Sequence, residues 1–278
     1  DNEFDNKAII AKMIGLRKEK AALMGFDSHS EYVLDNTMAK TPENVNELLN
    51  TIWEPGIEKA KGEVKALQDL ISSEGGNFKL AAWDWWHYSE KLRQEKFDFK
   101  EEEVKPYFSE DKVLQGAFEV ANKLFDITFE ESADLPKYRD NIKTFIVKDK
   151  SEKTIGIFYT DYTLRPNKGG GAWMSTFRDQ SKFDGEIIPL VINVCNFPPE
   201  NADGVSLLSF EQVETLFHEF GHGLHGLLSE AQYPSLSGTS VTRDYVEFPS
   251  QMMENWAREP EVIKTFAQHY QTGETIPD

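Results

Sequence analysis

Three of the six histidines in this 278-residue chain lie within one short segment, Leu216–Gly226, which reads LFHEFGHGLHG. His218 and His222 are four residues apart, so on an α-helix their imidazoles share one face on neighbouring turns. That spacing suits two ligands of a tetrahedral zinc ion. Glu219 follows His218 directly and lies on the flank of the same face, where its carboxylate can hold a zinc-bound water and act as its base.

The residues around this segment predict the helix that the spacing requires. Ser209–Gln212 reads SFEQ, which has the form of a capping box at a helix N-terminus. Apolar residues then recur at helical spacing and form a stripe opposite the two histidines: Val213, Leu216, Phe217, Phe220, Leu224 and Leu227. We therefore expect one face of the helix in a core and the other presenting both imidazoles.

A catalytic zinc site needs a third protein ligand and keeps one position open for water. The downstream segment SGTSVTRDYVEFPSQMMENW offers Asp244, Glu247 and Glu254 at suitable spacing. His225, one turn after His222, is a fourth candidate. The residues alone do not separate these four.

Two glutamates could also orient the metal ligands by hydrogen bonding to them without contacting the metal. Glu214 lies one turn before His218, and Glu254 lies two turns after Glu247. The alternative for each is an ordinary solvated acid on a helix surface.

The elements that carry these residues follow two hydrophobic periods. From Glu3 to about Leu124 the period is helical, with a helix start at Thr41-Pro42 and a break at residues 72–77, SSEGGN. From Lys143 to Phe197 the period changes to two, in short β-rich runs separated by turn signals. We predict a mainly helical fold with a small antiparallel sheet.

Aromatic residues gather in the segment AAWDWWHYSEKLR, which contains Trp83, Trp85 and Trp86. We expect this cluster to form core between helices, although it could instead line a cleft. Cys195 lies in an apolar run and is expected to be a small buried hydrophobic residue. A single cysteine excludes a disulfide framework and fits a reducing compartment.

The run Gly169–Gly171 precedes a short β-rich segment. It is no phosphate loop, because neither GKS nor GKT follows. The strand around Gly171, Ala172 and Trp173 could pair with an extended peptide, or it could be a plain core strand. Both interpretations remain open.

The charge balance and the distribution of apolar residues limit the classes of partner that we expect. Thirty basic against 48 acidic residues give a net charge of −18, and no Lys/Arg-rich stripe is present, so we expect no nucleic-acid partner. No uninterrupted apolar run reaches membrane-spanning length, so we expect no membrane partner either.

The segments FHEFGHGLH and SGTSVTRDYVEFPSQMMENW together resemble the thimet oligopeptidase family of zinc metallopeptidases, and within it most resemble the bacterial peptidyl-dipeptidases (dipeptidyl carboxypeptidases). The likeness extends through WDWWHYSEKLRQEK, VLQGAFEVANKLF, FYTDYTLRPNKGGGAWM and HYQTGETIPD, and so covers nearly the whole chain. It implies one zinc ion bound by His218, His222 and Glu247, with Glu219 as the base.

The resemblance also implies a zincin-like catalytic region in a two-lobed helical ellipsoid with a deep channel. On this basis residues 1–142 would form part of the channel wall. Residues 143–278 would be the catalytic region, with the sheet at 143–200 and the zinc-binding helices at 209–278. Family members continue beyond the point corresponding to Asp278 and also carry a substantial N-terminal portion. We therefore expect a fragment that is inactive or nearly so by itself, since the missing part carries the histidine- and tyrosine-bearing loop that contacts substrate.

The activity implied by the resemblance is zinc-dependent release of C-terminal dipeptides from short peptides. The alternatives are internal cleavage of oligopeptides, as in related members, and a non-catalytic zinc-holding module that binds peptides. An intact Glu219 argues against the last, because a pure binder has no need of a base. We expect a cytoplasmic location, with the periplasm also open.

Overall fold

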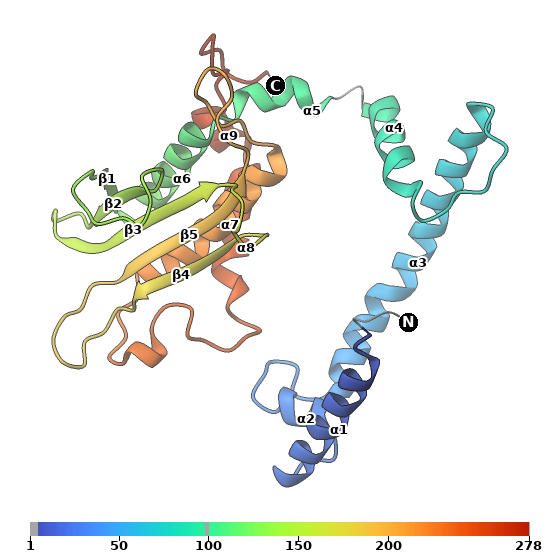
Figure 1. Cartoon of the computed structure of the whole chain (residues 1–278), viewed down its shortest axis with the longest axis horizontal. Helices are drawn as coiled ribbons and strands as arrows, with labels where there is room; N and C mark the ends of the chain where they lie inside the picture. Colours follow the sequence, from blue (N-terminus) through green and yellow to red (C-terminus); the bar gives the residue numbers. More distant parts are fainter. Residues whose placement is uncertain (1–4, 98–99, 278) are drawn as a thin grey trace. The chain divides into compact units, whose positions relative to one another are not determined.

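The computed structural model describes residues 5–97 and 100–277, and the chain divides into two compact units, Asp1–Phe99 and Lys100–Asp278 (Figure 1). The first unit is helical and contains α1 (Lys7–Leu23), α2 (His29–Leu34), α3 (Pro42–Ser73) and α4 (Trp85–Phe97). No helix within the described ranges is both long and apolar enough to cross a lipid bilayer.

The longest helix, α3, begins and ends where the sequence predicts. The Thr41 side chain caps its N-terminus by accepting a hydrogen bond from the Asn44 backbone N–H at 3.3 Å, and Pro42 occupies the first helical position. The helix ends at Ser73, within the glycine-containing break. Local capping and breaker residues are therefore sufficient to place this element.

The aromatic cluster around the start of α4 does not form the expected core between helices. Trp83 and Trp86 are 85% and 82% exposed. Among the described residues of the first unit only Ala21, Leu67 and Ile71 are buried, so its helices enclose little apolar volume. The prediction failed because aromatic residues are buried only where facing elements surround them.

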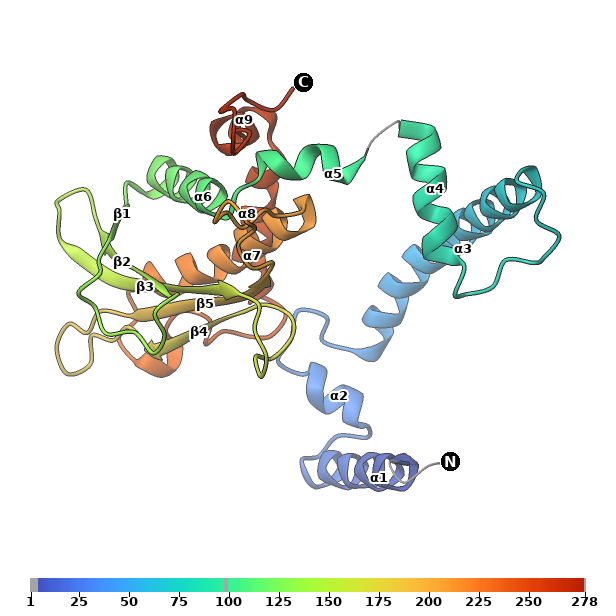
Figure 2. The same cartoon turned by 45° about the horizontal axis from the view of Figure 1, so that its top comes forward.

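The second unit holds a five-stranded sheet with helices on one face (Figure 2). Its helices are α5 (Glu101–Val104), α6 (Glu110–Phe125), α7 (Phe210–Leu227), α8 (Glu247–Arg258) and α9 (Pro260–Phe266), with short 3₁₀ turns at Lys105–Tyr107 and Pro234–Leu236. Its strands are β1 (Thr128–Glu131), β2 (Lys143–Lys148), β3 (Thr154–Thr163), β4 (Trp173–Arg178) and β5 (Leu190–Phe197).

The sheet is mixed, which corrects the expectation of a purely antiparallel one. The strand order is β1-β2-β3-β5-β4, and β3 runs parallel to β5 while every other pair is antiparallel. Burial explains the order: β5 is largely buried on both faces and takes an interior position, whereas β4 is largely exposed and lies at the edge. The chain therefore passes from β3 to the edge strand before it returns to the centre.

Helix α7 packs against this sheet, and its apolar stripe lies in a core, as predicted. Both capping-box bonds are present: the Gln212 backbone N–H donates to Ser209 Oγ at 3.2 Å, and the Ser209 N–H donates to Gln212 Oε1 at 2.9 Å. All six stripe residues are buried, and Phe220 joins a ring cluster with Phe118 and Phe158. Cys195 is also fully buried, as expected. Each buried side chain of this size contributes roughly 1.5–3 kcal/mol, so the helix is firmly anchored.

Helices α7 and α8 meet at a glycine. A Cβ atom on Gly221 would lie 2.6 Å from Ser250 Cα and 2.7 Å from the Pro249 carbonyl oxygen. Both are backbone atoms, which cannot rotate away as a side chain can. The separation of the two helices is therefore set by the absence of a side chain at residue 221.

Gly221→Ala should destabilise the second unit by about 1–3 kcal/mol, because the added methyl group forces the two helices apart. Gly62→Ala is the matched control: Gly62 lies inside α3, and a Cβ atom added there would have no neighbouring atom within 4 Å, so alanine should be neutral or stabilising. Urea denaturation of both variants measures the difference. An unchanged midpoint for Gly221→Ala would show that the helices tolerate a wider separation.

Candidate metal centre

Three possible metal ligands converge between α7 and α8. His218 and His222 lie one turn apart on α7, with ring centroids separated by 4.9 Å. Their Nε2 atoms lie 3.3 Å and 3.1 Å from Oε2 of Glu247, the first residue of α8. Within the described ranges, these three residues form the group whose ligand atoms all lie within 4.8 Å of one another.

This spacing fits a zinc ion. Ligand atoms about 2.0–2.1 Å from a tetrahedral zinc lie about 3.3 Å from each other. The two Nε2–Oε2 distances are close to that value. Two neutral imidazoles and one carboxylate are also a donor set typical of catalytic zinc, so the residues present fit the ion.

Glu254 orients the first histidine. Its Oε1 lies 2.6 Å from His218 Nδ1, and it comes from α8, two turns after Glu247. Donation of the Nδ1 proton to this carboxylate leaves the Nε2 lone pair free for a metal. The contact therefore fixes the orientation of the His218 ring, a candidate metal ligand.

The other residues considered from the sequence lie elsewhere. Glu214 forms an ion pair with Arg258, which links α7 to α8. His225 packs its ring toward Tyr245, with centroids 6.4 Å apart. Neither His225 nor Asp244 belongs to the converging group.

Glu219 is buried beside the ligands, with 5% of its surface exposed. Its pKa is raised to about 7, mainly by burial; His218 opposes this shift, and the neighbouring Glu247 carboxylate adds to it. Its Oε2 has no hydrogen-bond partner among the described residues. A buried carboxylate oxygen without a protein partner is costly unless water or a cation pairs with it. The cost is relieved if this oxygen faces a metal-bound water.

A cavity of about 360 Å³ opens onto these groups. One wall comes from Ala172 and from Trp173, the first residue of the edge strand β4, whereas Gly171 is not part of the lining. The sequence did not single out three of the lining residues, Met174, Thr239 and Val246, because no pattern marks a cavity wall. The full lining is Ala172, Trp173, Met174, His218, Glu219, His222, Thr239, Val246 and Glu247.

The chain belongs to peptidase family M3, whose family model matches residues 1–278. It is 40% identical over 275 residues to the dipeptidyl carboxypeptidase of Escherichia coli, with 99% of this chain and 40% of that protein covered. It is 36% identical to oligopeptidase A of Escherichia coli, covering 99% and 41%, and 37% identical to an organellar oligopeptidase A of Arabidopsis thaliana, covering 99% and 36%. The chain thus spans about two fifths of the length of these relatives.

Replacement of Glu254 tests its contact with His218. Glu254→Ala should weaken zinc binding about 10- to 100-fold, because the imidazole loses the carboxylate that fixes its orientation. Glu214→Ala is the matched control, since Glu214 pairs with Arg258 rather than with a candidate ligand. Competition with a chromophoric chelator measures both zinc affinities. Equal affinities for the two variants would contradict the assigned role of Glu254.

Proposed function

We propose that the protein is a zinc-dependent peptidase, with one zinc ion held by His218, His222 and Glu247 and with Glu219 as the general base. The observation that carries this proposal is the convergence of two Nε2 atoms and a carboxylate beside a buried glutamate whose Oε2 has no hydrogen-bond partner in the part of the chain that the structure describes. Membership of peptidase family M3 supports the reaction class.

Each group would have a distinct part in the reaction. A bound zinc ion supplies Lewis-acid chemistry, polarising the scissile carbonyl and a water molecule. Glu219 accepts the proton of the attacking water and passes it to the leaving amine. Glu254 keeps His218 oriented through its Nδ1 atom. The low exposure of Glu219 and His222 limits bulk water around these groups, which strengthens their electrostatic interactions.

The substrate would be an extended peptide lying along β4. This strand is at the edge of the sheet, and its first residues line the cavity beside the candidate ligands. An edge strand offers backbone donors and acceptors to which an extended peptide can pair. The same residues, Ala172 and Trp173, are those that the sequence offered for peptide pairing.

We further propose that the enzyme releases C-terminal dipeptides. The 40% identity to Escherichia coli dipeptidyl carboxypeptidase supports this specificity. The runner-up is internal cleavage, which the 36% identity to Escherichia coli oligopeptidase A supports.

Glu219→Gln tests the general base. The amide keeps the size of the side chain but cannot accept the proton, so turnover should fall by several orders of magnitude while zinc content stays unchanged. Peptide hydrolysis and metal analysis of the same preparation give both quantities. Near-normal turnover in this variant would refute the assignment.

Product analysis separates the two specificities. A hexapeptide with a free C-terminus should lose its last two residues as a unit. The C-terminal amide of the same peptide should be cleaved at least about tenfold more slowly, because it lacks a charge whose hydrogen bonds contribute roughly 1.5–3 kcal/mol. Mass spectrometry of the products identifies the bond cut. Equal internal cleavage of both peptides would favour the runner-up.

A further inference from the structure

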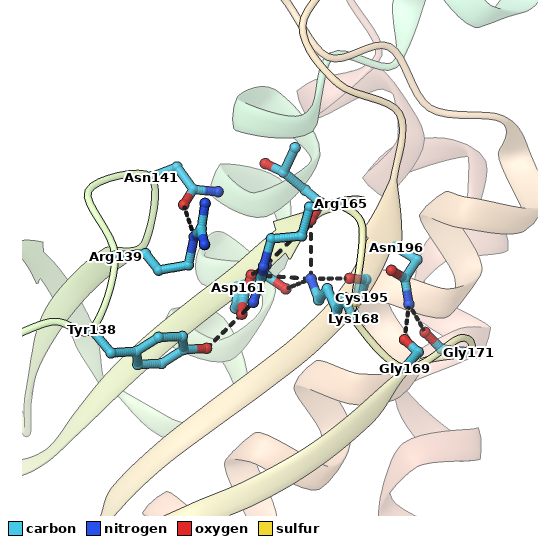
Figure 3. Close-up of polar contacts among 11 residues, drawn as sticks. Tyr138, Arg139, Asn141, Asp161, Arg165, Lys168, Gly169, Gly171, Cys195 and Asn196 are labelled. Carbon is cyan, nitrogen blue, oxygen red and sulfur yellow. Dashed lines mark hydrogen bonds and ion pairs between the residues drawn. The ribbon is translucent and has the colours of Figure 1, made fainter.

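A buried charge network lies at one end of the sheet (Figure 3). It involves Asp161 near the end of β3 and two cations, Arg165 and Lys168, in the loop that leads to β4. The side chains of Asp161 and Lys168 are only 1% and 3% exposed. A lysine is rarely buried this deeply unless its ammonium group is fully paired.

Asp161 is the anchor of the network. It accepts hydrogen bonds from both terminal nitrogens of Arg165, at 2.5 Å and 2.7 Å, and from the Tyr138 hydroxyl at 2.5 Å. Lys168 Nζ lies 3.0 Å away. Burial alone would raise the pKa of this carboxyl group, but the hydrogen bonds from Arg165, Tyr138 and Lys168 lower it to about 2. Asp161 is therefore charged at neutral pH.

Lys168 links the ends of two neighbouring strands. Besides the Asp161 carboxylate, its Nζ contacts the backbone carbonyl oxygens of Asp161 at 2.7 Å and of Thr163 at 3.1 Å, both in β3. It also donates to the Cys195 carbonyl oxygen in β5 at 2.5 Å. One ammonium group thus satisfies carbonyls of two parallel strands at the point where the loop leaves the sheet.

Asn196 holds the glycine run that follows. Its Nδ2 donates to the carbonyl oxygens of Gly169 and Gly171 at 2.7 Å and 2.8 Å (Figure 3). Gly171 has a φ of +83°, a conformation that a residue with a Cβ rarely adopts. The ring of Trp173 packs near Gly169, because a Cβ there would lie 3.6 Å from Trp173 Cη2. Ala172 and Trp173, the next two residues, line the cavity.

We propose that Lys168 and Asn196, anchored by Asp161, are positioning residues that fix the peptide-facing wall formed by Ala172 and Trp173 and thereby set the affinity for an extended peptide. The effect on peptide rests on the proposed peptidase function. The candidate metal ligands lie on α7 and α8, outside this network. Loosening the wall should therefore weaken peptide binding and leave zinc binding intact.

The test uses Lys168→Met and Asn196→Ala. The first removes the ammonium group at nearly constant side-chain length. The second removes only the two bonds to the glycine carbonyls and, at a partly exposed position, spares the buried charges. Lys153→Met is the matched control, because Lys153 pairs with Glu186 at 2.6 Å just before β3 and is 53% exposed.

Each variant is made in the zinc-loaded Glu219→Gln protein, so that peptide is bound without being cleaved. Fluorescence anisotropy gives the Kd of an uncharged hexapeptide labelled at its N-terminus. Metal analysis gives the zinc content, and hydrogen–deuterium exchange gives the exchange rate of the backbone amides at residues 169–176. Both test variants should bind peptide about tenfold more weakly. Their zinc content should be unchanged and exchange at 169–176 should be faster, while Lys153→Met matches the parent in all three.

The measurements separate failure of this proposal from failure of the proposed function. Unchanged exchange at 169–176 in both variants would overturn the claim that the network fixes the wall. Faster exchange with an unchanged peptide Kd would reduce the network to a purely structural role and overturn the proposal. A parent protein that loads zinc but binds no peptide would refute the proposed function, and exchange would still decide whether the network holds the wall.

Discussion

The close contact between α7 and α8 at Gly221 is the constraint on which the candidate centre depends. The two histidines come from one helix and the carboxylate from another, and ligand atoms about 3.3 Å apart require those helices to touch. Helix α8 brings Glu247, Ser250 and Glu254 to that contact at helical spacing. Glu247 is the candidate ligand, Ser250 Oγ donates to Glu247 Oε2 at 3.0 Å, and Glu254 holds His218. One helical face therefore supplies a ligand and two supporting bonds.

Strand β5 contacts both the helix that carries the two histidines, α7, and the strand that forms the opposite cavity wall, β4. The apolar stripe of α7 packs on the sheet, and a Cβ on Gly226 would come within 3.1 Å of Val191 in β5. Within the sheet, the edge strand β4 pairs with β5 along the side that faces away from β3, with Trp173 opposite Val194. Cys195 and Asn196 of the same strand bind the loop that precedes β4. The position of the cavity wall at Ala172 and Trp173 relative to the candidate metal ligands thus depends on one interior strand.

Local features of the fold could be predicted from the sequence, whereas long-range pairing could not. The stripe and the capping box of α7, and the Thr41 cap of α3, are encoded within a few residues, and each is present. The parallel pairing of β3 with β5 joins strands that are not consecutive, and periodicity carries no information on neighbours. A usable signal was present: residues 190–195 are almost continuously apolar, whereas half of residues 173–178 (WMSTFR) are polar, which favours an interior and an edge strand respectively.

In the candidate site, too, local features could be predicted from the sequence and contacts between helices could not. Spacing on one helix sufficed to propose His218, His222 and Glu219, but the third ligand stayed open among four residues, because its distance from the histidines depends on how two helices pack. The different partners of Glu214 and Glu254, Arg258 and His218, follow from that same packing. Trp83 and Trp86 were expected to be buried and are exposed, because composition predicts burial only where other elements supply a facing surface.

The proposed metal centre consists of two imidazoles and one carboxylate. Zinc K-edge X-ray absorption fine structure on the protein loaded with one equivalent of zinc tests it most directly. We expect two imidazole nitrogens at about 2.0–2.1 Å from the zinc, and carboxylate and water oxygens at about 2.0–2.2 Å. A shell with three imidazoles, or one with no imidazole pair, would contradict it.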